Sequence, residues 1–152
     1  MIKEGFSRRT FIAGASLAAL ALVIAPYTAR ADAKAVEDEL KKLFGGKQMS
    51  EGRVKLDVPQ IAENGLVVPI NLDVDSPMTE QDYVKTVHVF ADGNPSPYVI
   101  TYHFTPSNGR ASASNRIRLA KTQNIIAVAE MSDGSLHMAK SEVKVTIGGC
   151  GG

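Results

Sequence analysis

The stretch VVPINLDVD, residues 67–75, decides the fold class because apolar and polar side chains alternate along it. One face carries the apolar side chains of Val68, Ile70, Leu72 and Val74. A period of two residues is typical of a half-buried β-strand. Pro69 lacks a backbone N–H, which predicts that this part of the strand lies at a sheet edge or at a bulge.

Six other short runs have strand character, and turn-forming residues separate them. They are residues 53–61, 84–91, 98–104, 112–120, 124–131 and 139–147. The pair Asp133-Gly134 between the last two runs favours a tight hairpin turn. About seven short strands with regular turn signals predict an all-β protein with an immunoglobulin-like β-sandwich.

Two further features complete the expected fold. Residues 32–44 have apolar side chains at helical spacing, with acidic residues early and lysines late, which predicts a short amphipathic N-terminal helix. The glycine pair at 45–46 is expected to end this helix. Within residues 136–147 the apolar positions change phase between Met138 and Val143, which predicts a β-bulge in the last strand.

The N-terminus has the features of an export signal. Arg8 and Arg9 precede an apolar stretch that ends near Ile24 and is short for a membrane span. Ala29 and Ala31 form an A-x-A pattern, which predicts cleavage after Ala31. The paired arginines are similar to a twin-arginine signal, which exports folded proteins in bacteria. A general secretory signal and a permanent anchor are the alternatives, and we predict a periplasmic protein without a membrane attachment after signal removal.

The chain therefore divides into a signal (1–31), a helix (32–46), a sandwich domain (47–147) and a C-terminal arm (148–152). The signal holds four of the 17 basic and one of the 16 acidic residues, so the net charge of the remaining chain is −2. No basic cluster is left to neutralise phosphate groups, which argues against nucleic acid as a partner.

The expected domain shows no convincing active site. Three histidines fall on different predicted elements without metal-ligand spacing, which favours packing or surface roles: His88, His103 and His137. Four acidic residues could suggest a cation site, but solvated charge is favoured: Asp73, Asp75, Glu80 and Asp82. Motifs for haem attachment, phosphate binding or a nucleophile elbow are missing. The sequence predicts no cofactor, no metal and no catalytic residue of its own.

The chain ends in GGCGG, and Cys150 within this motif is the single cysteine. Glycine is the residue that costs most backbone entropy to order, so we expect a flexible arm: Gly148, Gly149, Gly151 and Gly152. Only Cys150 carries a side chain, which makes the arm narrow enough for an active-site channel of another protein. An exposed thiol in an oxidising compartment invites dimerisation and over-oxidation, which argues that it has a use. These properties are typical of a carrier.

The sequence resembles the SoxY family, whose members are the sulfur-carrier subunits of the bacterial Sox sulfur-oxidation system. The run IRLAKTQNIIAVAEMSDGSLHMAKSEVKVTIGGCGG, residues 117–152, is similar to the C-terminal half of that family, and the terminal GGCGG is its distinctive part. The resemblance implies that Cys150 is the site of covalent sulfur attachment and that the four glycines form its swinging arm. It also implies a carrier that is not itself an enzyme.

The resemblance further implies a set of partners. A small β-sandwich subunit, SoxZ, would form a heterodimer with the chain and share its twin-arginine export. A haem-containing enzyme would join thiosulfate to the cysteine as an S-thiosulfonate. A manganese hydrolase would then release sulfate, and in some organisms a sulfane dehydrogenase would oxidise the remaining sulfur.

Two other functions remain open. A ubiquitin-like sulfur carrier would hold a thiocarboxylate at Gly152, but it needs ATP-dependent activation, which export disfavours. An exported sandwich could also serve only for binding or assembly, with an incidental thiol on its tail.

Overall fold

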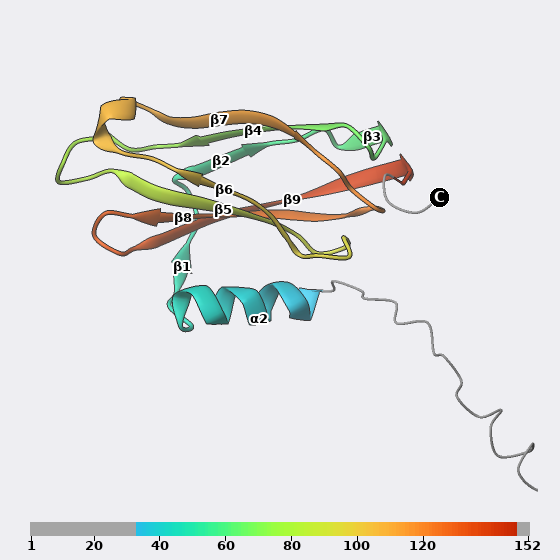
Figure 1. The fold of residues 1–152 in the computed structure, drawn as a ribbon, viewed down its shortest axis with the longest axis horizontal. Helices are drawn as coiled ribbons and strands as arrows, with labels where there is room; N and C mark the ends of the chain where they lie inside the picture. Colours follow the sequence, from blue (N-terminus) through green and yellow to red (C-terminus); the bar gives the residue numbers. More distant parts are fainter. Residues whose placement is uncertain (1–32, 149–152) are drawn as a thin grey trace, which may run out of the picture.

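The computed structural model describes residues 33–148, which form two β-sheets packed face to face with one helix outside them (Figure 1). The elements are α2 (Ala33–Phe44), β1 (Met49–Ser50), β2 (Val54–Asp57), β3 (Ile61–Asn64), β4 (Val68–Val74), β5 (Val84–Ala91), β6 (Tyr98–His103), the 3-10 turn η1 (Pro106–Asn108), β7 (Ala111–Ile117), β8 (Gln123–Met131) and β9 (Leu136–Ile147). This architecture confirms the predicted β-sandwich. No helix of the described part is long and apolar enough to cross a membrane.

The larger sheet has the strand order β1-β9-β8-β5-β6, and the smaller sheet has the order β2-β4-β7. β3 joins the larger sheet by pairing in parallel with the end of β9, while β1 pairs in parallel with its start. β8 pairs with β9 in antiparallel fashion on the other side. The last strand is therefore held on both sides where it approaches the C-terminal arm.

The core between the sheets follows from the alternation in residues 67–75. Along β4, the apolar residues of the predicted face are buried, and the residues between them are less so. Their partners across the core include Leu119, Ile125 and Val143, which have no exposed surface. Because β2 pairs only with residues 71–74 of β4, one side of β4 is unpaired at Pro69, as the proline predicts.

A second apolar cluster attaches helix α2 to the outer face of the larger sheet. Val36 and Phe44 of the helix pack with Phe90 of β5, and with residues of β8 and β9. Gly45 and Gly46 follow with φ angles of +63° and +78°, a left-handed conformation that suits glycine and ends the helix. The predicted helix and its stop are thus confirmed.

The predicted bulge in the last strand is wrong. β9 pairs with β8 in an unbroken register from Leu136 to Val143. The apolar phase changes because Leu136 faces the helix, whereas Val143 faces the core between the sheets. A strand buried on both faces carries apolar residues in both phases without a bulge.

The structure also refines the strand count, since residues 33–148 contain nine strands where about seven were expected. Residues 53–61 divide after Asp57, and their two parts lie in different sheets. The two-residue strand β1 has no alternation from which it could be recognised. At the predicted hairpin, Gly134 has a φ angle of +80° and the Met131 N–H donates to the Ser135 carbonyl at 3.0 Å.

Candidate functional site

Most residues predicted for the site lie outside the described part of the chain. This holds for Cys150 and its neighbours Gly149, Gly151 and Gly152, and also for the signal residues Arg8, Arg9 and Ala31. Gly148 is the last described residue and directly follows β9. The structure therefore describes the root of the arm, which we define as residues 145–148.

The root is fixed to β3 and the turn that follows it. The Gly65 N–H donates to the Ile147 carbonyl at 2.8 Å, and the Thr146 hydroxyl donates to the Glu63 carbonyl at 2.9 Å. β9 and β3 end side by side (Figure 1). The arm therefore starts from a hydrogen-bonded strand end.

The segment before β8 fixes the root from the other side. The Val145 N–H donates to the Thr122 hydroxyl at 3.0 Å. The Leu119 N–H donates to the Gly65 carbonyl at 2.8 Å, which ties this segment to the turn after β3. Two parts of the chain that are distant in sequence from β9, residues 63–65 and 119–122, thus converge on its last three residues.

Gly148 makes a close backbone contact that sequence reasoning missed. A Cβ atom at this position would lie 2.3 Å from the carbonyl oxygen of Ala120, closer than any side chain could be placed. The residue is nevertheless exposed on its other side. The first glycine of the motif is therefore required for space, in addition to the flexibility that the sequence predicted for it.

Exposed apolar side chains lie on the elements that adjoin the root, and we call this group the apolar rim. Its members lie on β3, on the turn after it and at the end of β9: Ile61 (60% exposed), Leu66 (47%), Val67 (54%) and Ile147 (69%). Only two other large hydrophobic side chains of the described residues are exposed to a comparable degree, Leu43 and Tyr98. Exposed apolar groups of this kind mark surfaces that contact other molecules.

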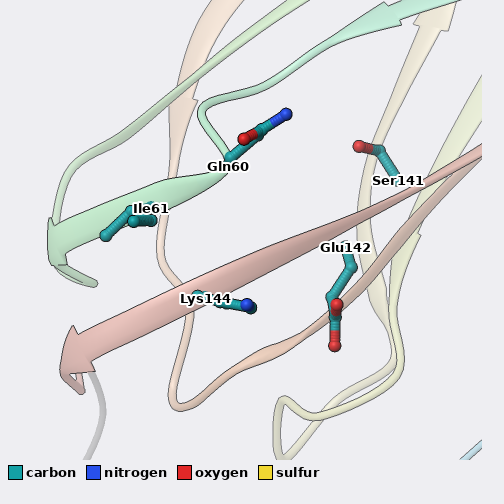
Figure 2. Close-up of a pocket in the computed structure, with 5 residues that line it drawn as sticks. All are labelled: Gln60, Ile61, Ser141, Glu142 and Lys144. Atoms are coloured by element: carbon teal, nitrogen blue, oxygen red, sulfur yellow. The ribbon is translucent and has the colours of Figure 1, made fainter.

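A shallow pocket of about 330 Å³ lies next to the rim, between the start of β3 and the middle of β9 (Figure 2). Its lining residues are Gln60, Ile61, Ser141, Glu142 and Lys144. The pocket occupies the stretch of β9 that neither β1 nor β3 covers. It contains a single carboxylate and no histidine or cysteine, so it offers neither a nucleophile with its base nor a metal site.

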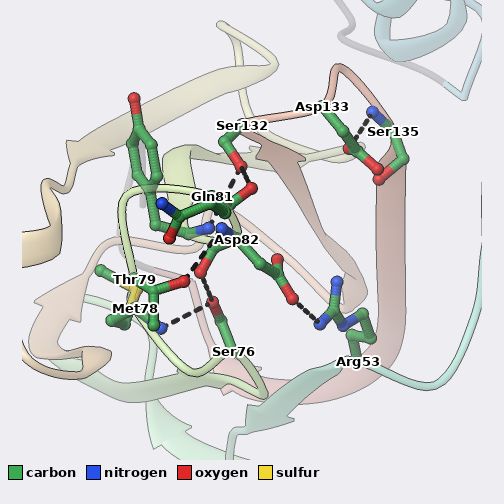
Figure 3. Close-up of polar contacts among 10 residues, drawn as sticks. Arg53, Ser76, Met78, Thr79, Gln81, Asp82, Ser132, Asp133 and Ser135 are labelled. Atoms are coloured by element: carbon green, nitrogen blue, oxygen red, sulfur yellow. Dashed lines mark hydrogen bonds and ion pairs between the residues drawn. The ribbon is translucent and has the colours of Figure 1, made fainter.

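The acidic residues considered for a cation site do not come together. Arg110 binds both carboxylate oxygens of Asp73, at 2.9 and 3.0 Å, and this hydrogen bonding lowers the pKa of Asp73. Asp82 accepts a hydrogen bond from Arg53 at 3.0 Å within a polar loop that also includes Ser76 (Figure 3). Among residues 33–148, no group of three or more histidine, cysteine or acidic residues could hold a metal ion.

His88 has the packing role that its sequence context favours. Its Nδ1 atom lies 2.9 Å from the Thr101 hydroxyl, and its ring meets Phe44 edge-on at 5.5 Å between centroids. Burial lowers the pKa of His88, nearby Glu130 raises it, and His103 lowers it. The neutral imidazole therefore belongs to the packing between helix α2 and the sheet.

Comparison with known proteins identifies the family. Residues 40–150 match the family described as sulfur oxidation protein SoxY, which covers well over half of the chain. The chain belongs to the SoxY family. This SoxY family chain is similar to the solved sulfur carrier protein SoxY from Chlorobium limicola f thiosulfatophilum, with 32% identity and a TM-score of 0.64, over 76% of this chain and 100% of that one. The role of the chain is thus that of a carrier in sulfur oxidation.

Other solved structures share the fold at lower identity. The superoxide reductase (neelaredoxin) from Ignicoccus hospitalis has 16% identity and a TM-score of 0.55, over 62% of this chain and 80% of that one. A putative superoxide reductase from Thermotoga maritima has 20% identity and a TM-score of 0.52, over 70% of this chain and 89% of that one. At such identities the likeness shows the sandwich fold alone. No curated protein sequence gives a significant match.

Proposed function

We propose that this SoxY family chain is a periplasmic carrier that holds thiosulfate-derived intermediates on the thiol of Cys150. It presents them to the other enzymes of the Sox system and catalyses no step itself. The observation that carries the proposal is a lone cysteine placed three residues beyond a fixed strand end, next to which the apolar rim lies. The family match also extends to residue 150.

The length of the arm links the rim to the function. Consecutive Cα atoms are about 3.8 Å apart, so the Cα atom of Cys150 can lie at most about 8 Å from that of Gly148. A channel that receives the thiol must therefore bring its mouth against the surface around the root. The side chains that it meets there belong to the apolar rim, and their burial would favour the encounter.

The covalent chemistry needs only the thiolate of this chain and two partner enzymes. The Cys150 thiolate and the outer sulfur of thiosulfate form an S–S bond with loss of two electrons, which a haem-containing partner accepts. Water then cleaves the bond between the sulfane and sulfone sulfurs at a manganese hydrolase, which releases sulfate and two protons and leaves a cysteine persulfide. A sulfane dehydrogenase is the partner that would oxidise the persulfide sulfur.

Export and pairing belong to the same proposal. A twin-arginine signal with Arg8 and Arg9, cleaved after Ala31, would carry the folded chain out together with a SoxZ-like subunit.

Intact-mass measurement on protein from cells that oxidise thiosulfate tests the proposal. We expect an added S2O3 group, or a single added sulfur, that maps to Cys150 and is removed by a thiol reductant. The Cys150→Ser variant is the matched control and should carry neither while unfolding at the same temperature. Sulfur at Gly152 would indicate the ubiquitin-like mechanism, and an unmodified chain would indicate a binding or assembly subunit; either result contradicts the proposal.

A further inference from the structure

One polar side chain is buried in the described part of the chain. Among residues 33–148, Gln123 is the one polar or charged residue that the fold buries, with 4% of its surface exposed. It is the first residue of β8. A buried amide destabilises a fold unless its hydrogen-bonding groups find partners, so those partners indicate what the residue contributes.

The Gln123 amide connects two loops. Its Oε1 atom accepts a hydrogen bond from the Gly93 N–H at 2.7 Å. Its Nε2 group donates to Asn94 Oδ1 at 2.9 Å and to the Lys121 carbonyl at 3.0 Å. Gly93 and Asn94 belong to the loop between β5 and β6, whereas Lys121 belongs to the loop between β7 and β8. The buried side chain therefore uses both its oxygen and its nitrogen to hold these loops together.

Asn94 extends this connection to the peptide that Gly148 contacts. The Asn94 Oδ1 atom also accepts a hydrogen bond from the Ala120 N–H at 2.9 Å, and its Nδ2 group donates to the Arg118 carbonyl at 2.8 Å. The carbonyl oxygen of Ala120 is the atom that leaves no space for a side chain at Gly148. The two amide side chains thus bind three backbone groups of residues 118–121, next to the root of the arm.

The loop that carries Asn94 is itself fixed to the larger sheet. The Asp92 carboxylate accepts hydrogen bonds from the backbone N–H and the Nδ2 group of Asn124, at 2.8 and 2.7 Å. Gly93 lies so close to Gln123 that a Cβ atom on Gly93 would be 2.8 Å from the Gln123 Cβ atom. Asn94 is therefore presented to the root from a firmly held loop.

We propose that Asn94 and Gln123 are positioning residues of the carrier, which hold residues 118–121 against Gly148 and so fix the place where the arm starts. The inference rests on the proposed function, because this place matters only if the thiol must enter the channel of a partner. With at most about 8 Å between the Cα atoms of Gly148 and Cys150, the arm has little length to compensate for a displaced root. A misplacement of about 1 Å can lower the rate of a reaction about a hundredfold.

A purely structural role is the alternative, since the same hydrogen bonds also stabilise two loops. A matched control removes similar bonds beyond the other end of β9, far from the root. There the Ser132 hydroxyl accepts from the Tyr83 N–H at 3.2 Å and donates to the Gln81 carbonyl at 3.1 Å (Figure 3). Ser132→Ala should therefore lower stability without moving the arm.

The first test compares two reactions of Cys150 in the exported protein, at a temperature where every variant is folded. Intact mass follows loading with thiosulfate by the haem-containing partner, and absorbance follows the reaction with the small disulfide reagent DTNB. We expect Gln123→Met and Asn94→Ala to lower kcat/KM for enzymatic loading at least about tenfold and to leave the DTNB rate within about twofold. Asn94→Asp should restore most of the loading, because a carboxylate oxygen still accepts from Ala120 and Gln123.

The second test needs no partner enzyme. Spin labels on Cys150 and on Ser107→Cys in η1 report the position of the arm. Their distance distribution should shift or broaden in Gln123→Met and Asn94→Ala but not in Ser132→Ala. Asn94→Ala serves alone if the change at the buried Gln123 prevents folding.

The two tests separate this inference from the proposed function. Parental distances or parental loading rates in the Asn94 and Gln123 variants would overturn it, and so would equal losses in Ser132→Ala. If the parent protein accepts no thiosulfate, the proposed function fails, and the label distances still decide whether the two residues position the arm.

Discussion

Replacing Gly148 by alanine tests whether the first glycine of the arm is there for space. The added methyl carbon would lie 2.3 Å from the Ala120 carbonyl oxygen, and ordinary contact begins at 3.4 Å, so the two backbones must separate by about 1 Å. Flexibility alone would make Gly148 and Gly149 equivalent. The close contact with the Ala120 carbonyl instead predicts that alanine has a larger effect at Gly148 than at Gly149.

The hydrogen bonds around the root decide which backbone moves. Ala120 is held because its N–H donates to Asn94 at 2.9 Å, and the neighbouring Leu119 N–H donates to Gly65 at 2.8 Å. The end of β9 is held at its last position by the hydrogen bond from Gly65 to Ile147 and by the pairing of Ile147 with Asn64 of β3. The strand end is therefore expected to lift, at a cost of about 1 kcal/mol for that hydrogen bond. The arm would then start about one residue earlier and in another direction.

Two measurements follow this change. Thermal unfolding should show a loss of about 1 kcal/mol for Gly148→Ala. Spin labels on Cys150 and on Ser107→Cys report the position of the arm, because Ser107 lies in η1 at the opposite end of the sandwich (Figure 1). The distance distribution between the two labels should shift or broaden in Gly148→Ala.

Gly149→Ala is the matched control, since it adds the same methyl group one residue later. We expect its unfolding free energy and label distances to stay closer to those of the parent protein. Equal effects of the two substitutions on both measurements would refute the argument, because the contact with Ala120 would then have no consequence for the arm.

Three further predictions concern the helix, the core and the rim. Burial lowers the pKa of His88 below its usual value of 6.5, so the unfolded chain binds the proton more readily than the folded chain. The contribution of neutral His88 to stability is therefore full above pH 6.5 and falls as the pH drops toward the folded pKa. Denaturant titrations at several pH values should show a shallower fall in unfolding free energy for His88→Gln. Phe90 has no exposed surface beneath helix α2, so Phe90→Ala should cost about 3–5 kcal/mol of unfolding free energy and Phe90→Leu clearly less, as measured by chemical denaturation. Ile147→Ser should change the unfolding free energy by less than about 0.5 kcal/mol but lower the rate of sulfur loading by the partner enzymes. Leu43→Ser makes an equally polar change at an exposed site on helix α2 and should leave that rate unchanged.

Sequence predicts an element well when the residues close to it in the chain determine its structure. The alternation in residues 67–75 marked β4 because one of its faces meets the core along its whole length. Residues 33–44 were recognised as a helix because their charge order and the glycine pair after them act locally. Both signals work without knowledge of the rest of the chain.

The errors arise where tertiary contacts override the local pattern. The phase change before Val143 was interpreted as a bulge because nothing in β9 shows that helix α2 covers Leu136. The space requirement at Gly148 depends on Ala120, which the chain approaches only after folding. The rim was missed for the same reason, since its residues are scattered between Ile61 and Ile147, and the elements that carry them adjoin only through the parallel pairing of β3 with β9.

A fixed root and a small rim together suit a carrier that must be released after each step. A short tether raises the effective concentration of the bound sulfur at a channel only if the tether starts at a defined place. Stable complexes bury about 800 Å² on each partner, far more than four side chains supply. The rim therefore favours brief contacts. Under the proposed function, a partner enzyme would gain its selectivity from the arm inside its channel rather than from the surface around the root. On this argument, an enlarged apolar rim would strengthen docking but slow turnover, because the loaded carrier would leave its enzyme more slowly.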